Sequence, residues 1–488
     1  SQPYTISQTP RIPTPELELQ ADAMFVYSTA IESILGWKER GYTVWTMGGS
    51  RDGKEYADGN PAELQRSRDG QPLTIEGSYY LHPTPKRIEI ESKYYAQALQ
   101  NGSDGICPEE PEYWARAGYE DAFKEAWQKE YNAPWQPPHS SLDARYRASR
   151  LMGHLEERHI DTLLKNAQTQ KPNLRRLVAL HSPINYAQWG IVAPQNRITS
   201  LESVQEVIGQ VWTGTARSPV RYAGLRQDLT FALAYLEYSS LYQMVRGTNK
   251  RMWFLLDPLE DNPSRSQQDY KSHYEDTLAA ALLFPDVNAY EVMPWPERVF
   301  GHIPPAYATQ VNSVTAALQE MHNQTEIKGN PAEANNIGVF VSDSMQYQRE
   351  APNASDYDGV FGLSLPLLQH GVPVQMVSLD RANNPNYLKA FKTLVLSYDY
   401  QKPPSSAVHT ALSNWVKAGG SLVFVGGTDA YHKVGDSWWQ QATYSTPQAD
   451  LWNQLGISTG NPLTNIGTAE PPYSFTELAR ADGNEHDL

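Results

Sequence analysis

The segments EVIGQVW (206–212), TFALAYLEYSSLYQMVR (230–246) and RMWFLLD (251–257) follow one another along the chain. The first and third are short and apolar, and each ends in polar residues, which is typical of strands buried on both faces of a sheet. The middle segment has the length of a helix. The order therefore predicts two parallel strands joined by a helical crossover.

The same alternation extends through residues 21–328. Eight segments match the strand pattern: 24–28, 42–47, 78–82, 104–107, 175–181, 206–212, 251–257 and 289–295. Eight strand–helix units in about 300 residues predict a (β/α)8 TIM barrel, which belongs to the α/β class. Residues 1–20 are polar and rich in proline, and we expect them to form an N-terminal arm.

A second pattern follows residue 336, after the linker-like stretch GNPAEANN (329–336). Four short apolar segments match strands, and a helix at 407–418 ends at Gly419 and Gly420, where glycine commonly terminates a helix. The four segments are 337–341, 372–377, 393–397 and 421–425. Residues 336–488 are therefore predicted to form a smaller doubly wound, flavodoxin-like α/β domain.

Composition excludes several classes of partner. The chain of 488 residues has 40 basic and 55 acidic side chains, a net charge of −15, which argues against nucleic acid and anionic membranes. A single cysteine, Cys107, excludes an intrachain disulfide and a cysteine metal cluster. The chain starts at SQPYTISQTP without methionine, so we expect a removed export signal and a secreted or periplasmic location, with a cytoplasmic one left open.

Aromatic residues are abundant, with 13 tryptophans, 29 tyrosines and 11 phenylalanines. Aromatic rings either fill a large core or stack on sugar rings. Trp212 and Trp295 close predicted strands and are the better sugar platforms, whereas Trp253 lies within a strand and is expected in the core.

Active sites of TIM barrels lie at the carboxyl ends of the strands. The residues that the predicted strands bring to that end are His82, Glu109, Glu110, His181, Asn185, Tyr186, Trp212, Arg217, Asp257, Glu260, Trp295 and Glu297. Hydrolysis of a glycosidic bond needs one carboxylic acid to protonate the leaving oxygen and one carboxylate to attack or to activate water. This set of carboxylates and aromatic residues suits that reaction.

The segment GICPEEPEYW (105–114) is the most specific local signal. It crowds three glutamates beside the end of a strand, and such crowding raises at least one carboxyl pKa, as a general acid at neutral pH requires. The alternative interpretation is an exposed acidic loop with turns fixed by proline.

Glutamate followed by proline at the end of the fourth strand resembles the acid/base pattern of the large clan of (β/α)8 glycosidases. The helix-like stretch 117–135, AGYEDAFKEAWQKEYNAPW, is similar to the corresponding helix of family 42 β-galactosidases. The resemblance implies that Glu110 is the general acid and that β-galactosides are the first substrates to consider. It also implies that the α/β domain corresponds to that family's trimerisation domain, which resembles a class I amidotransferase fold.

Two departures from the family stand out. Glu109 occupies the position of an asparagine, and the strand-seven nucleophile, a glutamate in the family, is replaced by Asp257. The shorter side chain widens the gap between the two carboxyl groups, so retention and inversion of the anomeric configuration both stay open. Asp257 is the first choice for nucleophile or base, although it could instead cap a helix, and Glu297 is the reserve.

Several alternatives follow from the same residues. His82 and His181 lack a second histidine at ligand spacing, so we expect no metal and no cofactor. Amidotransferase chemistry is excluded because Cys107 lies in the barrel, which leaves the α/β domain a role in a homo-oligomer, with a trimer first. A non-catalytic carbohydrate-binding barrel and a polysaccharide lyase remain the alternatives, and the acidic site disfavours the lyase.

Overall fold

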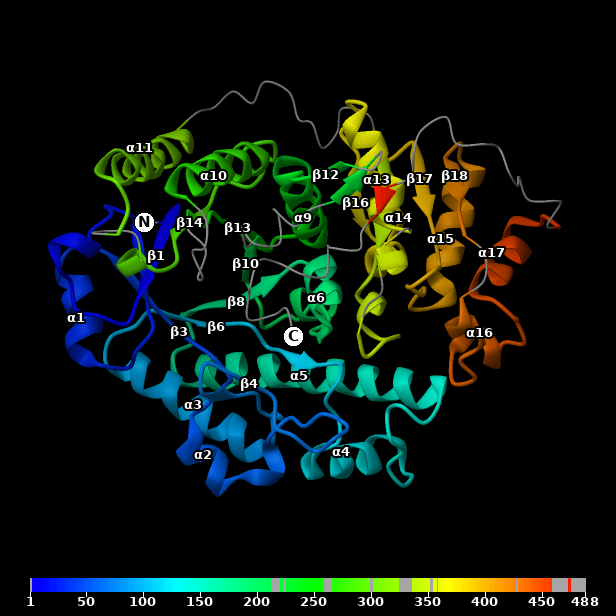
Figure 1. The fold of residues 1–488 in the computed structure, drawn as a ribbon, viewed down its shortest axis with the longest axis horizontal. Coiled ribbons are helices and arrows are strands. Elements are labelled where there is room, and N and C mark those ends of the chain that lie inside the picture. Colours follow the sequence, from blue (N-terminus) through cyan, green and yellow to red (C-terminus); the bar gives the residue numbers. More distant parts are fainter. Residues whose placement is uncertain are drawn as a thin grey trace.

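The computed structural model contains a closed barrel and a separate four-stranded sheet (Figure 1). The structure describes residues 2–211, 220–222, 225–258, 266–298, 302–323, 336–351, 354–357, 359–426, 429–458 and 473–474. The predicted fold class, a TIM barrel followed by a smaller α/β domain, is confirmed.

Eight parallel strands form the barrel, and each pairs with its neighbours in chain order. They are β1 (Thr5–Thr9), β2 (Ala23–Val26), β3 (Thr43–Gly48), β6 (Gly105–Pro108), β8 (Arg175–His181), β10 (Glu206–Gln210), β13 (Arg251–Leu255) and β14 (Tyr290–Met293). Side chains that point inward fill the barrel, and Trp45 meets Trp253 edge-on with ring centroids 5.8 Å apart. Trp253 is thus a core residue, as predicted.

The first strand corrects the predicted N-terminal arm. Ile6 of β1 pairs with Ala23 of β2, and Thr5 pairs with Tyr290 of β14, so β1 closes the barrel. Its outward polar side chains find partners on neighbouring segments; the Ser7 hydroxyl donates to the Met293 carbonyl of β14 at 3.0 Å. A strand with serine and threonine on its outer face lacks the apolar signature that identified the other strands.

The segment 78–82, predicted as the third barrel strand, lies outside the barrel. Only Ser78–Tyr79 (β5) is extended, and it pairs antiparallel with Thr74–Ile75 (β4) in a two-stranded sheet. Since β1 replaces it in the count, β6 is still the fourth strand of the barrel and β13 the seventh.

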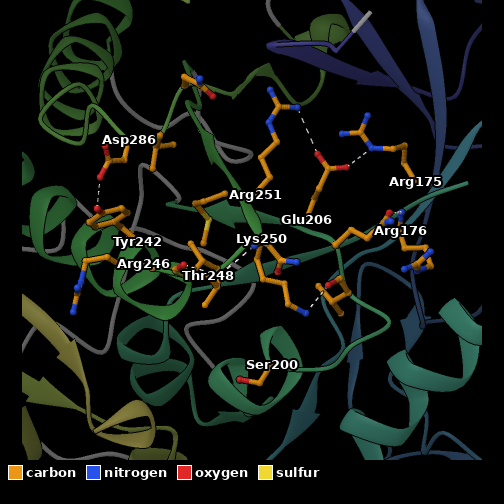
Figure 2. A pocket seen from close by; sticks show the side chains of 18 of the residues that line it. Arg175, Arg176, Ser200, Glu206, Tyr242, Arg246, Thr248, Lys250, Arg251 and Asp286 are labelled. Carbon is orange, nitrogen blue, oxygen red and sulfur yellow. Dashed lines mark hydrogen bonds and ion pairs between the residues drawn. The ribbon is translucent and has the colours of Figure 1, made fainter. Parts of the chain in front are cut away.

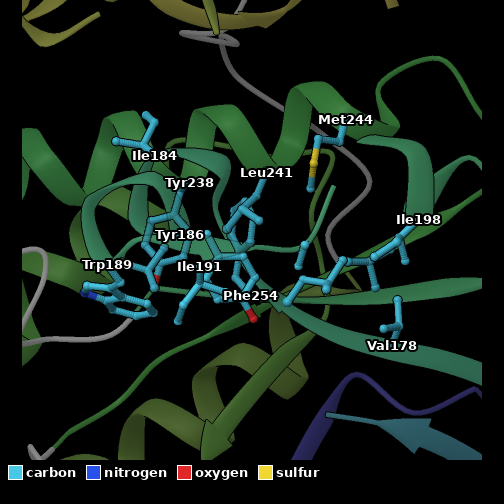
Figure 3. Close-up of a cluster of buried hydrophobic side chains, with 14 of the residues drawn as sticks. Val178, Ile184, Tyr186, Trp189, Ile191, Ile198, Tyr238, Leu241, Met244 and Phe254 are labelled. Carbon is cyan, nitrogen blue, oxygen red and sulfur yellow. The ribbon is translucent and has the colours of Figure 1, made fainter. Parts of the chain in front are cut away.

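Helices surround the barrel. They are α1 (Ile31–Glu39), α2 (Lys54–Gly59), α3 (Pro85–Gln100), α4 (Asp121–Tyr131), α5 (Leu142–Gln170), α6 (Pro183–Trp189), α7 (Gln195–Thr199), α9 (Thr230–Val245), α10 (Gln267–Ala281) and α11 (Pro305–Met321). Figure 3 shows the apolar layer between barrel and helices, where the ring of Tyr238 of α9 packs at a tilt against that of Phe254 of β13, with centroids 4.4 Å apart. No helix in the described part of the chain is long and apolar enough to cross a membrane.

Three small sheets lie outside the two main ones. One is the β4–β5 hairpin, and another pairs β7 (Tyr113–Trp114) with β9 (Ile191–Val192). The third joins β11 (Val220–Tyr222), β12 (Leu225–Gln227) and β19 (Tyr473–Ser474), so a segment near the end of the chain pairs with the connection between β10 and α9.

The α/β domain has the parallel strand order β16–β15–β17–β18, which is flavodoxin-like. Its strands are β15 (Ile337–Val341), β16 (Gln375–Ser378), β17 (Thr393–Leu396) and β18 (Ser421–Phe424). Its helices are α13 (Phe361–Gln369), α14 (Pro385–Leu388), α15 (Ser406–Lys417), α16 (Trp438–Gln441) and α17 (Pro447–Leu455). Buried Gln375 of β16 bonds Tyr235 and Ser239 of α9, at 2.7 and 2.8 Å, and joins the domain to the barrel.

Candidate active site

A pocket of about 590 Å³ opens at the carboxyl ends of the barrel strands, where TIM barrels carry their active sites. Six of the eight strands, or the residues directly after them, contribute to its wall. The lining residues are Gln8, Pro10, Arg11, Arg51, Glu76, Glu109, Glu110, His181, Trp189, Gln210, Leu255, Asp257, Pro294, Trp295, Glu297 and Arg298. The predicted residues Glu109, Glu110, His181, Asp257, Trp295 and Glu297 are therefore brought together.

Glu109 and Glu110 extend strand β6 beyond its last residue. The Glu109 amide donates to the Gly48 carbonyl of β3 at 2.9 Å, and the Glu110 amide donates to the Ala179 carbonyl of β8 at 3.0 Å. Consecutive side chains of a strand normally point to opposite faces. Glu110 has a φ of 52°, in the left-handed region that non-glycine residues seldom adopt, and this turn allows both carboxyls to line one pocket.

Glu110 is held by His181, the last residue of β8. Nε2 of His181 lies 3.0 Å from Oε1 of Glu110. The His181 ring packs edge-on against Trp189 and at a tilt against Tyr186, with ring centroids 4.7 and 5.5 Å apart, so its orientation is fixed from behind. The Glu110 side chain is 19% exposed, which leaves it open to the pocket.

Glu109 lies deeper. Burial raises its pKa well above the ordinary range, and the neighbouring Glu110 and Glu291 carboxyls raise it further, against the opposing charge of Arg51. Tyr27 donates to its Oε1 at 3.3 Å. The raised pKa favours the protonated form of Glu109, and a protonated carboxyl can donate a hydrogen bond, as the side-chain amide of an asparagine does.

Asp257 lies two residues after β13 and is 3% exposed. Its Oδ1 is 3.7 Å from Nη2 of Arg298. The following helix, α10, is capped by Ser266, whose side chain accepts from the Asp269 amide, so Asp257 does not cap that helix. Asp257 is therefore not the N-cap of α10, and residues 259–265, which follow it, lie outside the described residues.

Sequence reasoning missed a fourth carboxyl, Glu291 of β14. It is fully buried inside the barrel, and neither of its carboxyl oxygens has a hydrogen-bond partner among the described residues. Burial raises its pKa to about 8, with smaller contributions from Asp257 and Glu110. A single glutamate in an apolar strand can also be a paired one, such as Glu206 of β10, which accepts from Arg175, so the sequence alone does not single out Glu291.

Aromatic rings flank the carboxyls. Trp295 follows β14 and is half-buried, with its ring centroid 5.7 Å from that of Tyr27. Trp189, at the end of α6, lines the pocket beside His181. Glu297 accepts a hydrogen bond from Thr9 of β1, which ties the loop after β14 to the first strand.

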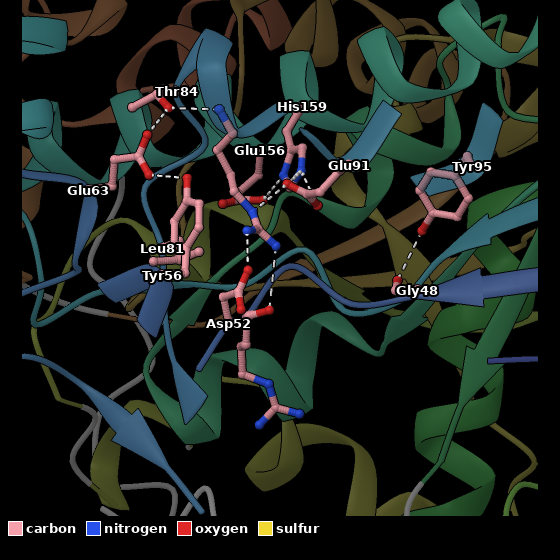
Figure 4. Close-up of polar contacts among 12 residues, drawn as sticks. Gly48, Asp52, Tyr56, Glu63, Leu81, Thr84, Glu91, Tyr95, Glu156 and His159 are labelled. Atoms are coloured by element: carbon pink, nitrogen blue, oxygen red, sulfur yellow. Dashed lines mark hydrogen bonds and ion pairs between the residues drawn. The ribbon is translucent and has the colours of Figure 1, made fainter. Parts of the chain in front are cut away.

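The loop after β3, which brings Arg51 to the pocket, is anchored by a buried charged network (Figure 4). Arg87 of α3 donates to Asp52 at 2.6 Å. His159 of α5 bonds Glu91 at 3.0 Å and Glu156 at 3.2 Å. Burial lowers the pKa of His159, but the two glutamates outweigh it and raise the pKa to about 10, so this histidine is a cation at neutral pH.

Three predicted substrate-binding residues do not line the pocket. His82 is buried against Tyr113, whose hydroxyl is 2.8 Å from Nδ1, and burial lowers its pKa to about 3. Asn185 donates to Glu237 at 2.7 Å, and Tyr186 lies behind His181. His82 was misplaced because its segment is not a barrel strand. Trp212, Arg217 and Glu260 lie outside the described residues.

The residues that sequence reasoning missed come mainly from β1 and from loops. Gln8, Pro10 and Arg11 line the pocket because β1 belongs to the barrel. Arg51 and Glu76 arrive from the long connection between β3 and α3. Only Gln210, at the inward end of β10, could have been found by extending the alternation of that strand.

A larger pocket of about 1070 Å³ lies at the opposite end of the barrel (Figure 2). Its central carboxylate, Glu206, accepts from Arg175 at 2.7 Å and from the Trp253 indole at 3.0 Å. Lys250 donates to the Val204 carbonyl at 2.6 Å. These charges are engaged in closing the amino end of the barrel, where TIM barrels carry stabilising rather than catalytic residues.

The fold is similar to those of solved β-galactosidases. The enzyme from Halorubrum lacusprofundi has a TM-score of 0.63 at 11% identity, over 92% of this chain and 76% of the other. The enzyme from Marinomonas ef1 has a TM-score of 0.59 at 9% identity, over 87% and 75%. Gan42B, a family 42 β-galactosidase from G. stearothermophilus, has a TM-score of 0.53 at 12% identity, over 89% and 75%.

No protein-family model matches this sequence, and no curated protein matches it. At identities of 9 to 12% the likeness establishes the fold alone. The chain is a (β/α)8 barrel with an attached α/β domain, of the architecture seen in family 42 β-galactosidases, as the sequence resemblance implied.

Proposed function

We propose that this protein is a glycoside hydrolase. The observation that carries the proposal is the single pocket in which Glu110, supported by His181, and Asp257 occur together at the ends of the fourth and seventh barrel strands. Two separate carboxyls and flanking aromatic rings are what glycoside hydrolysis requires. A non-catalytic sugar-binding barrel would not need several carboxyls crowded around one partly buried pocket, because bringing like charges together there destabilises the folded protein.

Glu110 acts as the general acid that protonates the glycosidic oxygen as the bond breaks. His181 positions the Glu110 carboxyl through its hydrogen bond. Asp257 either attacks the anomeric carbon or activates a water for that attack. The Arg298 guanidinium lies 3.7 Å from Oδ1 of Asp257 and forms an ion pair with it.

The first substrate class is β-galactosides, because several of the solved structures that share the fold are named β-galactosidases, although one is named an α-L-fucosidase. The test is release of 4-nitrophenol from a panel of 4-nitrophenyl β-glycosides, compared with the Asp257→Asn variant. Hydrolysis that is lost in Asp257→Asn and retained in Glu112→Gln supports the proposal. Glu112 is a fitting control because it belongs to the same acidic segment but does not line the pocket.

The α/β domain is proposed to form a homo-oligomer contact, with a trimer first. Strand β18 is the last strand of its sheet; Val423 on it and Val425 directly after it are 45% and 38% exposed. Exposed apolar side chains on an edge strand favour pairing with another chain.

A further inference from the structure

Two glutamines in the pocket wall are not used by the proposed chemistry. Gln8 of β1 and Gln210 of β10 are 1% and 5% exposed, and both line the pocket. Nε2 of Gln8 and Oε1 of Gln210 have no hydrogen-bond partner within the part of the chain that the structure describes. Rotation about the last side-chain bond exchanges the two amide atoms, so each glutamine can present a donor or an acceptor to the pocket.

The buried glutamines outside the pocket, as far as the structure describes them, each make at least one side-chain hydrogen bond. Even Gln401, whose Oε1 has no partner, donates from Nε2 to the Phe340 and Ser397 carbonyls, both at 3.0 Å. Gln65 bonds the Leu81 and Glu112 carbonyls, both at 3.1 Å, and Gln375 bonds Tyr235 and Ser239. A buried amide without a partner destabilises the folded protein, so it is retained where a ligand completes its hydrogen bonds. Both Gln8 and Gln210 point to a ligand in the same pocket.

The chemistry of the wall indicates what that ligand is. An amide both donates and accepts, which matches a hydroxyl group and not a carboxylate or sulfate, which only accept. The charges of Arg51 and Arg298 are directed at Glu109 and Asp257. The whole lining contains five carboxyl side chains and three arginines, the third being Arg11, so an anionic sugar would meet more carboxyls than cations.

We propose that Gln8 and Gln210 bind hydroxyl groups of the sugar that occupies this pocket, and so select a neutral glycone over an acidic one. Strands β14 and β13 lie between β1 and β10 in the barrel, so the two amides flank the part of the wall that carries Asp257 and Trp295. This proposal rests on the proposed glycosidase function and adds its substrate class.

The experiment compares Gln8→Met and Gln210→Met with Gln375→Met. Methionine keeps the volume and removes the amide. In the two pocket variants we expect a Tm equal to the wild type or higher by about 2 °C, because an unpartnered polar group is removed. We also expect kcat/KM on 4-nitrophenyl β-D-galactoside to fall about 10-fold, mainly through KM. Gln375→Met should instead lower Tm and leave kcat/KM of the folded protein unchanged.

Deoxy sugars identify the hydroxyl. Removing the hydroxyl that Gln210 binds should lower wild-type kcat/KM about 10-fold. The Gln210→Met variant should have the same kcat/KM on the deoxy sugar as on the parent sugar. A lower Tm in both pocket variants with unchanged kcat/KM would overturn the proposal, as would a wild-type preference for 4-nitrophenyl β-D-galacturonide.

Failure of the proposed function is detected separately. If the wild type hydrolyses no glycoside of the panel, calorimetric binding of galactose and galacturonate shows whether the pocket binds a neutral or an acidic sugar. Galactose binding that weakens about 10-fold in Gln210→Met supports the hydroxyl-binding role without catalysis. Absence of galactose binding, or binding of galacturonate alone, overturns it.

Discussion

Nε2 of His181 and Oε1 of Glu110 lie 3.0 Å apart, across the junction between strands β8 and β6. The pair links the most specific sequence signal, the glutamates after the fourth strand, to a residue of the neighbouring strand. It gives Glu110 one defined orientation at the edge of the pocket, which a general acid needs if its proton is to reach the leaving oxygen.

His181→Phe should lower kcat about 10- to 100-fold, because the ring keeps its contacts with Trp189 and Tyr186 while the bond to Glu110 is lost. Loss of that bond should also shift the pH at which activity declines, which a purely structural defect would not do. The control is Tyr186→Phe, since the Tyr186 hydroxyl has no partner among the described residues. A His181→Phe enzyme with wild-type kcat and pH profile would remove His181 from this role.

Glu291→Gln should stabilise the protein increasingly as the pH rises. The unfolded chain loses the Glu291 proton near pH 4.5, whereas the folded protein keeps it to about pH 8. Wild-type stability from this group is therefore full at acid pH and is lost as the pH rises through that window. Glutamine does not ionise, so the unfolding free energy of the variant should exceed that of the wild type by an amount that grows to on the order of 4 kcal/mol at pH 8.

Urea unfolding of both proteins at pH 4.5, 6, 7 and 8 measures this difference. All curves are fitted with one shared m-value. A stability difference that does not change with pH would show that Glu291 ionises normally in the folded protein.

The wild-type chain should form a homo-oligomer at micromolar concentration, with a mass three times the 54.9 kDa of one chain as the first expectation. Val423→Lys places a charge on the exposed face of edge strand β18 and should release monomers. Light scattering of both proteins is the measurement. A monomeric wild type would exclude the oligomeric role of the α/β domain, and hydrolysis would be unaffected because the site lies in the barrel.

The barrel could be predicted from the sequence because most of its strands are apolar runs, such as RMWFLLD at 251–257, followed by helices. Strand β1 could not, because TISQT satisfies its outward polar groups with partners distant in sequence, among them Met293. Residues 78–82 were predicted as a barrel strand because their aromatic and apolar side chains match the strand pattern, but part of this segment forms the small hairpin with β4 instead.

The site was predicted wherever a carboxyl directly follows a correctly placed strand, as with Glu110 and Asp257. Gln8 was missed together with β1, and Glu291 was missed because its importance depends on the absence of a partner, which only the three-dimensional arrangement reveals. His82 was assigned to the site through the wrong strand and lies buried against Tyr113 instead.

The role of Glu110 as general acid is tested by how strongly its loss depends on the leaving group of the substrate. Glu110→Gln should reduce kcat on a β-galactoside with an alkyl or sugar leaving group about 10²- to 10⁴-fold, the usual worth of general acid catalysis. The same variant should lose much less on 2,4-dinitrophenyl β-D-galactoside, whose leaving group departs without a proton. Equal losses on both substrates would contradict the assignment and transfer the role to Glu109.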